Sequence, residues 1–239
     1  MPTPLAPPVM KRADDVFFTT LSVIMLAFVV VGFAPSYFLR GAVFATLPSL
    51  LVHLHGAAFS SWIILFVVQS SLVATGNIRL HRKLGYAGAV LAALMVIFGI
   101  TATIGALRRG AELPSFFTPP SFLVTNTLGI LIFGAYVGVA VWKRNNRKVH
   151  KRLMLIANTM ILPPALSRIE FVQTHFYMIP VICLGTVVLL FVYDLFTWRK
   201  PLLVTVLGGL LYVAANPLMD AVQHTAFAQR AVAWAQHHP

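Results

Sequence analysis

Two short basic segments, each with one histidine, are the parts of this chain best suited to chemistry. Residues 79–84 are Arg-Leu-His-Arg-Lys-Leu, and residues 148–153 are Lys-Val-His-Lys-Arg-Leu. Each segment lies between two long apolar stretches. Because a neutral imidazole is a good ligand for haem iron and for other metals, His81 and His150 are the candidate metal ligands.

The similarity continues upstream and indicates an internal repeat. Residues 48–52, Pro-Ser-Leu-Leu-Val, recur as Pro-Ser-Phe-Leu-Val 72 residues later, and the two histidines are 69 residues apart. This pattern predicts two copies of a helix–loop–helix hairpin, in units 48–106 and 120–167. Two hairpins inserted in the same sense are related by an axis along the membrane normal, which puts His81 and His150 at one depth. The sequence leaves open whether their rings converge.

The composition predicts a membrane protein. Of the 239 residues 59% are hydrophobic and 10% are charged, and the mean hydropathy is +0.84, whereas soluble domains carry about 25% charged residues. The net charge of +12 does not indicate nucleic-acid binding, because the bases lie in short loops between apolar spans. The single cysteine, Cys183, excludes a disulfide within the chain and a Cys-based zinc site.

Apolar runs of about 20 residues predict an all-α integral membrane protein with seven transmembrane helices, of which the second to fifth form a four-helix bundle of two repeated hairpins. The span 153–167 is the least regular, because it contains Asn158 and the pair Pro163-Pro164. Residues 1–15 are expected to form a flexible tail, and residues 219–239 an outer-side tail or surface helix. The expected spans are 16–36, 49–73, 85–107, 121–143, 153–167, 177–197 and 201–218.

The bases are unequally divided between the two sides of the predicted membrane domain (16–218). Thirteen of the 18 Lys and Arg residues fall on the side of the N-terminus and the histidine segments. Because cytoplasmic loops are enriched in Lys and Arg, this side is expected in the cytoplasm. The sequence therefore predicts a multi-pass protein of the bacterial inner membrane, with a cytoplasmic N-terminus and a periplasmic C-terminus.

The inner histidine pair has two interpretations. In the first, His81 and His150 bind haem b, and bases of the same segments, such as Arg82 and Arg152, hold its propionates. In the second, each histidine is an interfacial residue that contacts lipid phosphate. Asp194, near the same side, is expected to pair with the basic segments or to orient a histidine.

A second set of histidines is expected on the outer side. His53 and His55 start the second helix, and His175 starts the sixth, so His55 and His175 are candidates for an outer cofactor site. The alternative is that these residues cap helices or bond to neighbours. The chain has no Gly-rich phosphate loop, no His-Glu-x-x-His motif and no serine nucleophile elbow, so no catalytic residue is assigned and enzyme activity is left open.

The segments His81-Arg82-Lys83-Leu84-Gly85 and His150-Lys151-Arg152-Leu153-Met154, followed by Arg168, resemble an uncharacterised bacterial family of multi-span membrane proteins. That family has a His-Arg-x-Leu-Gly loop and a later His-Arg-x-Trp-Met loop, and Leu153 here departs from it. The likeness covers about residues 48–170, and that family has no known activity that could be carried over to this chain. A weaker architectural likeness to b-type cytochromes implies haem held between paired histidines.

The expected function is electron transfer through haem b, to or from a quinone or a redox partner protein. The alternative is a non-enzymatic membrane protein that binds a lipid, a quinone or a partner subunit without a metal. A transporter is a third possibility, but the sequence lacks a pair of plainly interrupted helices.

Overall fold

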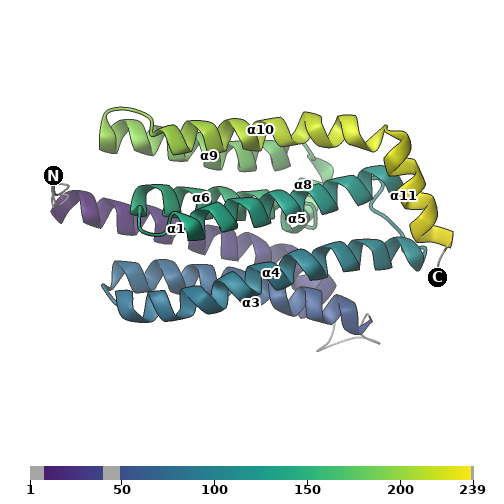
Figure 1. The fold of residues 1–239 in the computed structure, drawn as a ribbon, viewed down its shortest axis with the longest axis horizontal. Helices are drawn as coiled ribbons and strands as arrows, with labels where there is room; N and C mark the ends of the chain where they lie inside the picture. The colour runs from purple at the N-terminus through teal and green to yellow at the C-terminus, as the bar shows by residue number, and fades with distance from the viewer. Residues whose placement is uncertain (1–7, 40–48, 238–239) are drawn as a thin grey trace.

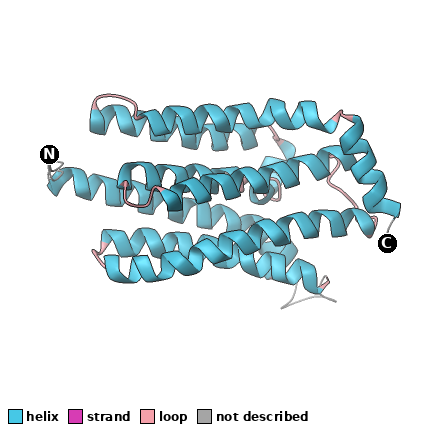
Figure 2. Ribbon diagram, viewed as in Figure 1, coloured by secondary structure: helices cyan, strands magenta, loops and turns pink. Residues whose placement is uncertain are grey.

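The computed structural model describes residues 8–39 and 49–237. Helices make up 85% of the described residues, and no strand occurs among them (Figure 2). The long helices lie roughly side by side in an elongated bundle, with the two chain ends at its opposite ends (Figure 1). The predicted all-α class is confirmed.

Six helices among the described residues are long and apolar enough to cross a membrane. Only 22–33% of the residues in their apolar windows are buried, so much of their apolar surface stays accessible, which is expected for contact with lipid. We therefore treat the chain as an integral membrane protein. The six helices are α1 (Pro8–Phe33), α3 (Leu50–Ala74), α4 (Ile78–Arg108), α5 (Pro119–Trp142), α9 (Met178–Trp198) and α10 (Leu203–Gln223).

The fifth predicted span differs from expectation. It consists of α6 (Arg147–Met160), followed by the short helices α7 (Pro163–Leu166) and α8 (Glu170–Thr174). Proline has no backbone N–H, so the Pro163-Pro164 pair interrupts the hydrogen bonds that would continue α6. At about 1.5 Å per residue α6 is roughly 21 Å long, short of a hydrocarbon core of about 30 Å. The structure thus supports six long spans and one interrupted segment.

The N-terminal boundary also differs. Helix α1 begins at Pro8, so residues 8–15, expected in a flexible tail, are helical, while residues 1–7 lie outside the described residues. At its far end α1 continues into a short π-helix, η1 (Ala34–Phe38).

The turns 75–77, 143–146 and 199–202 lie at the same end of the bundle as the start of α1 (Figure 1, left). We call this the basic end, because the bases beside these turns gather there. At the opposite end, α11 (Ala226–His237) lies across the bundle and packs against α4 and α5 (Figure 1, right). Val232 and Ala235 of α11 bury their side chains beside Leu107 of α4.

The two predicted hairpins, α3/α4 and α5/α6, meet along α4 and α5. A Cβ atom on Gly134 of α5 would lie 2.9 Å from the Val96 side chain of α4, so the helices approach closely there. A Cβ atom on Gly138 would meet no neighbour within 4 Å. The superposition of units 48–106 and 120–167 stays a prediction.

Candidate functional site

The two histidine segments form the first turns of α4 and α6, and the two helices begin in the same way. The Asn77 side chain accepts a hydrogen bond from the Leu80 amide at 3.3 Å, and the Asn146 side chain accepts one from the Val149 amide at 3.3 Å. An asparagine at this position satisfies an amide that the helix leaves unpaired. The histidine follows four residues later in each case, so its place on the helix is set by the cap.

The rings of His81 and His150 lie next to each other at this end of the bundle. Their centroids are 6.3 Å apart, and their planes are nearly perpendicular, at 86°. The convergence that the sequence left open is therefore decided by the packing of α4 against α5 and of α5 against α6.

Each ring has one nitrogen without a hydrogen-bond partner among the described residues. Nδ1 of His150 lies 2.9 Å from the Ala140 carbonyl oxygen. Since a carbonyl only accepts, the proton belongs on Nδ1, which leaves a lone pair on Nε2. Burial lowers the pKa of His150 below its usual value, and the bond to Ala140 partly opposes this shift. Nδ1 of His81 is buried and unpaired.

Both histidines line a cavity of about 710 Å³ enclosed by α1, α3, α4, α5 and α6. Its apolar wall includes Trp62, Phe66 and Met154. Besides His81 Nδ1, two other buried polar atoms of the lining have no partner among the described residues, namely Thr19 Oγ1 and Gln69 Oε1. Buried polar atoms are normally paired, so three unpaired atoms around one cavity indicate a bound molecule or ordered water.

Charged side chains also line the cavity at the basic end. Lys151 forms an ion pair with Asp14 of α1 at 2.5 Å, and the Tyr193 hydroxyl of α9 donates to the same carboxylate at 2.5 Å. The burial of Lys151 lowers its pKa, and Asp14 opposes this shift. The other charged lining residues are Asp15, Arg82, Arg144 and Arg147.

Arg152, expected at the cofactor, lies elsewhere. It is fully buried and forms an ion pair with Asp194 of α9, and its Nε donates to Oδ1 at 2.9 Å. Thr205 of α10 donates to the same carboxylate. Arg152 does not line the cavity, because its helical position turns it away from α3 and α4 toward α9. The predicted pairing of Asp194 with the basic segments is confirmed.

Trp62, in the middle of α3, connects the two hairpins. Its indole Nε1 donates to Oδ1 of Asn158 on α6 at 3.0 Å, and both side chains are buried. Asn158 was the polar residue that made the fifth span irregular, and its amide also donates to the Met154 carbonyl at 2.8 Å. Asn158, a polar residue of α6, therefore stabilises the packing of α6 against α3 beneath the cavity.

The outer histidines do not come together. His55 stacks on Phe59, with centroids 4.2 Å apart, and Nδ1 of His175 lies 3.0 Å from the Phe171 carbonyl and 2.8 Å from the Thr174 hydroxyl. Within residues 49–237 no hydrogen bond or ring contact joins His55 to His175. His175 thus bonds to its own neighbours, as in the alternative interpretation, whereas Nε2 of His53 and Nδ1 of His55 are buried without a hydrogen-bond partner among the described residues.

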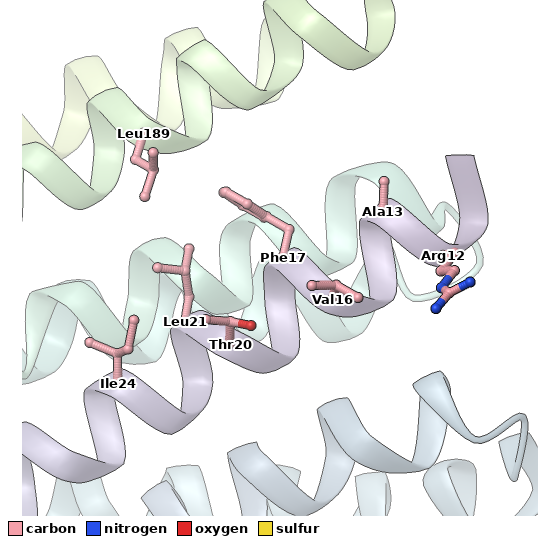
Figure 3. Close-up of a pocket in the computed structure, with 8 residues that line it drawn as sticks. All are labelled: Arg12, Ala13, Val16, Phe17, Thr20, Leu21, Ile24 and Leu189. Carbon is pink, nitrogen blue, oxygen red and sulfur yellow. The ribbon is translucent and has the colours of Figure 1, made fainter. Parts of the chain in front are cut away.

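A second concavity lies between α1 and α9 (Figure 3). It has a volume of about 660 Å³, and its lining is apolar apart from Arg12 and Thr20. Leu189 of α9 forms one side, and residues of α1 such as Phe17 form the other. Since this groove opens sideways between two apolar helices, it faces lipid and brings no groups together for chemistry.

Within the described ranges, no three His, Cys, Asp or Glu side chains are grouped so that they could hold a metal ion by themselves. The site at the basic end thus offers two imidazole nitrogens in a cavity that is apolar inside and charged at one end. Comparison of the chain with protein-family models, with curated proteins and with solved structures finds no match.

Proposed function

We propose that this protein binds haem b between His81 and His150 and transfers electrons at the membrane. The observation that carries the proposal is the convergence of the two rings, 6.3 Å apart, on one cavity. With metal–nitrogen bonds of about 2.0–2.1 Å, two imidazoles that bound one metal would have ring centroids within roughly 6 Å of each other. The ring separation therefore suits one metal between the two histidines.

The cavity also suits a cofactor of this kind. Its volume of about 710 Å³ lies within the range of about 300–1,000 Å³ that is usual for small-molecule sites. The apolar wall at Trp62 and Phe66 fits a flat macrocycle, and the unpaired His81 Nδ1 fits a ligand atom. Arginines at the basic end fit carboxylates.

When bound, haem supplies an iron that takes up and releases one electron. The protein's own residues position it. The Nδ1–H of His150 donates to the Ala140 carbonyl, which fixes the orientation of the ring, so Nε2 would be the atom that holds the iron. The Trp62–Asn158 hydrogen bond holds α3 against α6 beneath the rings. The electron partner in this proposal is a quinone or a redox protein, and the site is at the cytoplasmic face of the bacterial inner membrane.

The test is the visible absorption spectrum of the purified full-length protein, first oxidised and then reduced. The wild type is expected to show haem bands, and His81→Ala and His150→Ala are each expected to lose them. His55→Ala and His175→Ala, which change the outer histidines, serve as matched controls and keep the bands. A colourless wild-type protein that stays colourless after addition of haem would refute the proposal, as would loss of the bands only in the outer variants.

The second candidate function is metal-free binding of a lipid, a quinone or a partner subunit in the same cavity. The observation in its favour is that Gln69 Oε1 and Thr19 Oγ1 are buried and unpaired. These atoms can hydrogen-bond to a headgroup or a quinone without a metal. In this case the wild type is colourless, and both inner histidine variants keep their folding stability.

A further inference from the structure

The charges around the cavity do not cancel. Four bases and two acids line it, so its formal charge is +2 when both imidazoles are neutral. Asp14 is already paired with Lys151 and accepts from Tyr193. The excess positive charge therefore lies with the three arginines of the lining, Arg82, Arg144 and Arg147.

The three arginines lie beside the turns of the basic end. Arg144 is in the turn 143–146, Arg147 is the first residue of α6, and Arg82 follows His81 on α4. All three are exposed, and none forms an ion pair with a carboxylate of residues 12–39 or 49–237. Guanidinium groups without a carboxylate partner are well suited to bind carboxylate or phosphate oxygens.

The lining thus has two different parts. Near Trp62 and Phe66 it is apolar, and beside the turn 143–146 it is basic. A ligand that matches both parts has an apolar body that enters between the helices and anionic groups that remain at the basic end.

We infer that the ligand of this cavity carries one or two anionic groups, which Arg144, Arg147 and Arg82 bind at the basic end. For haem these groups are the two propionates, and in that form the inference rests on the proposed function. An anionic phospholipid offers the same chemistry through its phosphate. The sequence predicted Arg152 in this anion-binding role, but the guanidinium of Arg152 is buried against Asp194.

The experiment separates the anionic groups from the metal. Metal-free protoporphyrin IX and its dimethyl ester share one macrocycle, but only the diacid carries two carboxylates. Each is titrated by fluorescence into the full-length protein in detergent. The variants are Arg144→Gln/Arg147→Gln and a control, Arg79→Gln/Arg199→Gln, which removes two exposed bases at the same end that do not line the cavity. Native mass spectrometry of each preparation identifies lipid that remains bound.

The wild type and the control are expected to bind the diacid more tightly than the diester. Charge-assisted hydrogen bonds are worth enough that the Arg144→Gln/Arg147→Gln variant is expected to bind the diacid about tenfold more weakly or worse, with the diester unchanged. Equal affinity of the wild type for diacid and diester, or equal losses in both double variants, would overturn the inference.

If the wild type binds neither porphyrin and stays colourless after addition of haem, but retains an anionic phospholipid that only the Arg144→Gln/Arg147→Gln variant loses, the inference holds and the haem proposal fails. If neither porphyrin nor such a lipid binds, both fail. Unfolding temperatures of the two double variants are compared as well, since both change exposed bases and both are expected to fold like the wild type.

Discussion

At the scale of single residues, the histidines depend on polar contacts that hold the surrounding helices in place. The most buried of these is the ion pair between Arg152 and Asp194, whose side chains are both 0% exposed. The Thr205 hydroxyl donates to Asp194, so α6, α9 and α10 are joined at one carboxylate. This network lies two residues along α6 from His150, so it sets the position of the helix that carries His150.

Arg152→Met is expected to lower the free energy of unfolding by about 3–5 kcal/mol, because it leaves the Asp194 carboxylate buried without its cation. Arg79→Met, which changes an exposed arginine, is expected to cost no more than about 0.5 kcal/mol. Unfolding in detergent, followed by circular dichroism with rising temperature or denaturant, gives both values. Arg152→Met/Asp194→Leu is expected to recover part of the loss, and a double variant less stable than Arg152→Met would contradict this account.

Gly85 allows a test of the cavity that does not touch the histidines. A Cβ atom there would have only Nε2 of Gln69 nearby, at 3.6 Å, and the residue lines the cavity. Gly85→Leu is therefore expected to occupy the cavity and abolish ligand binding at an unchanged unfolding temperature. Gly138→Leu is the matched control, because it adds the same side chain where no atom lies within 4 Å. Porphyrin titration of both variants checks the prediction, and full binding by Gly85→Leu would refute it.

At the scale of secondary-structure elements, the interrupted segment α6–α8 determines how α1 packs. A Cβ atom on Gly32 of α1 would lie 2.1 Å from the backbone oxygen of Ala165 on α7. Such a distance is impossible without movement of one backbone, so the two elements meet in direct contact at this glycine. The break after α6 brings α7 to this position, since a continuous helix would carry its residues past α1.

Gly32→Ala is expected to destabilise the protein by about 1–3 kcal/mol or more, because α1 must move away from α7. Gly138→Ala is expected to be neutral or stabilising by up to about 1 kcal/mol, since alanine favours helix and the site has room. The unfolding temperature in detergent distinguishes the two. Equal stability of the variants would show that α1 and α7 do not meet closely.

At the scale of the whole molecule, the bundle has two chemically different ends. The cavity with both inner histidines lies at the basic end, and α11 covers α4 and α5 at the other (Figure 1). In α11, Trp234 lies under the guanidinium of Arg108 of α4, with 5.1 Å between the guanidinium carbon and the ring centroid. A tryptophan that is half exposed beside an arginine suits the boundary between lipid and water.

The division of bases predicts that the basic end faces the cytoplasm. A reporter fused to the N-terminus or inserted at 144–146 is expected to give a cytoplasmic signal, and one fused to the C-terminus a periplasmic signal. The chain ends lie at opposite ends of the bundle, which requires opposite signals (Figure 1). Signals from the same side for both termini would contradict this arrangement.

The sequence by itself determined the properties that depend on local composition. Mean hydropathy and run length predicted the membrane class and seven spans, of which six are long helices in the structure, because transfer into lipid depends on the residues of each span alone. The Pro163-Pro164 pair, which interrupts the fifth span, is visible in the sequence, but it predicted only a kink within one helix. The asparagine caps are also present in the sequence, four residues before each histidine, but the pattern of basic residues alone does not indicate them.

Which side chains meet depends on the packing of the helices against one another. His81 and His150 converge because packing fixes the rotation of α4 and α6 about their axes, which no local pattern specifies. The rotation of α6 turns Arg152 toward Asp194, whereas Arg144, in the turn 143–146 before α6, lines the cavity. The two arginines are only eight residues apart in the sequence. Residue type and spacing select the candidates for a site, whereas the orientation of each helix against its neighbours selects among them.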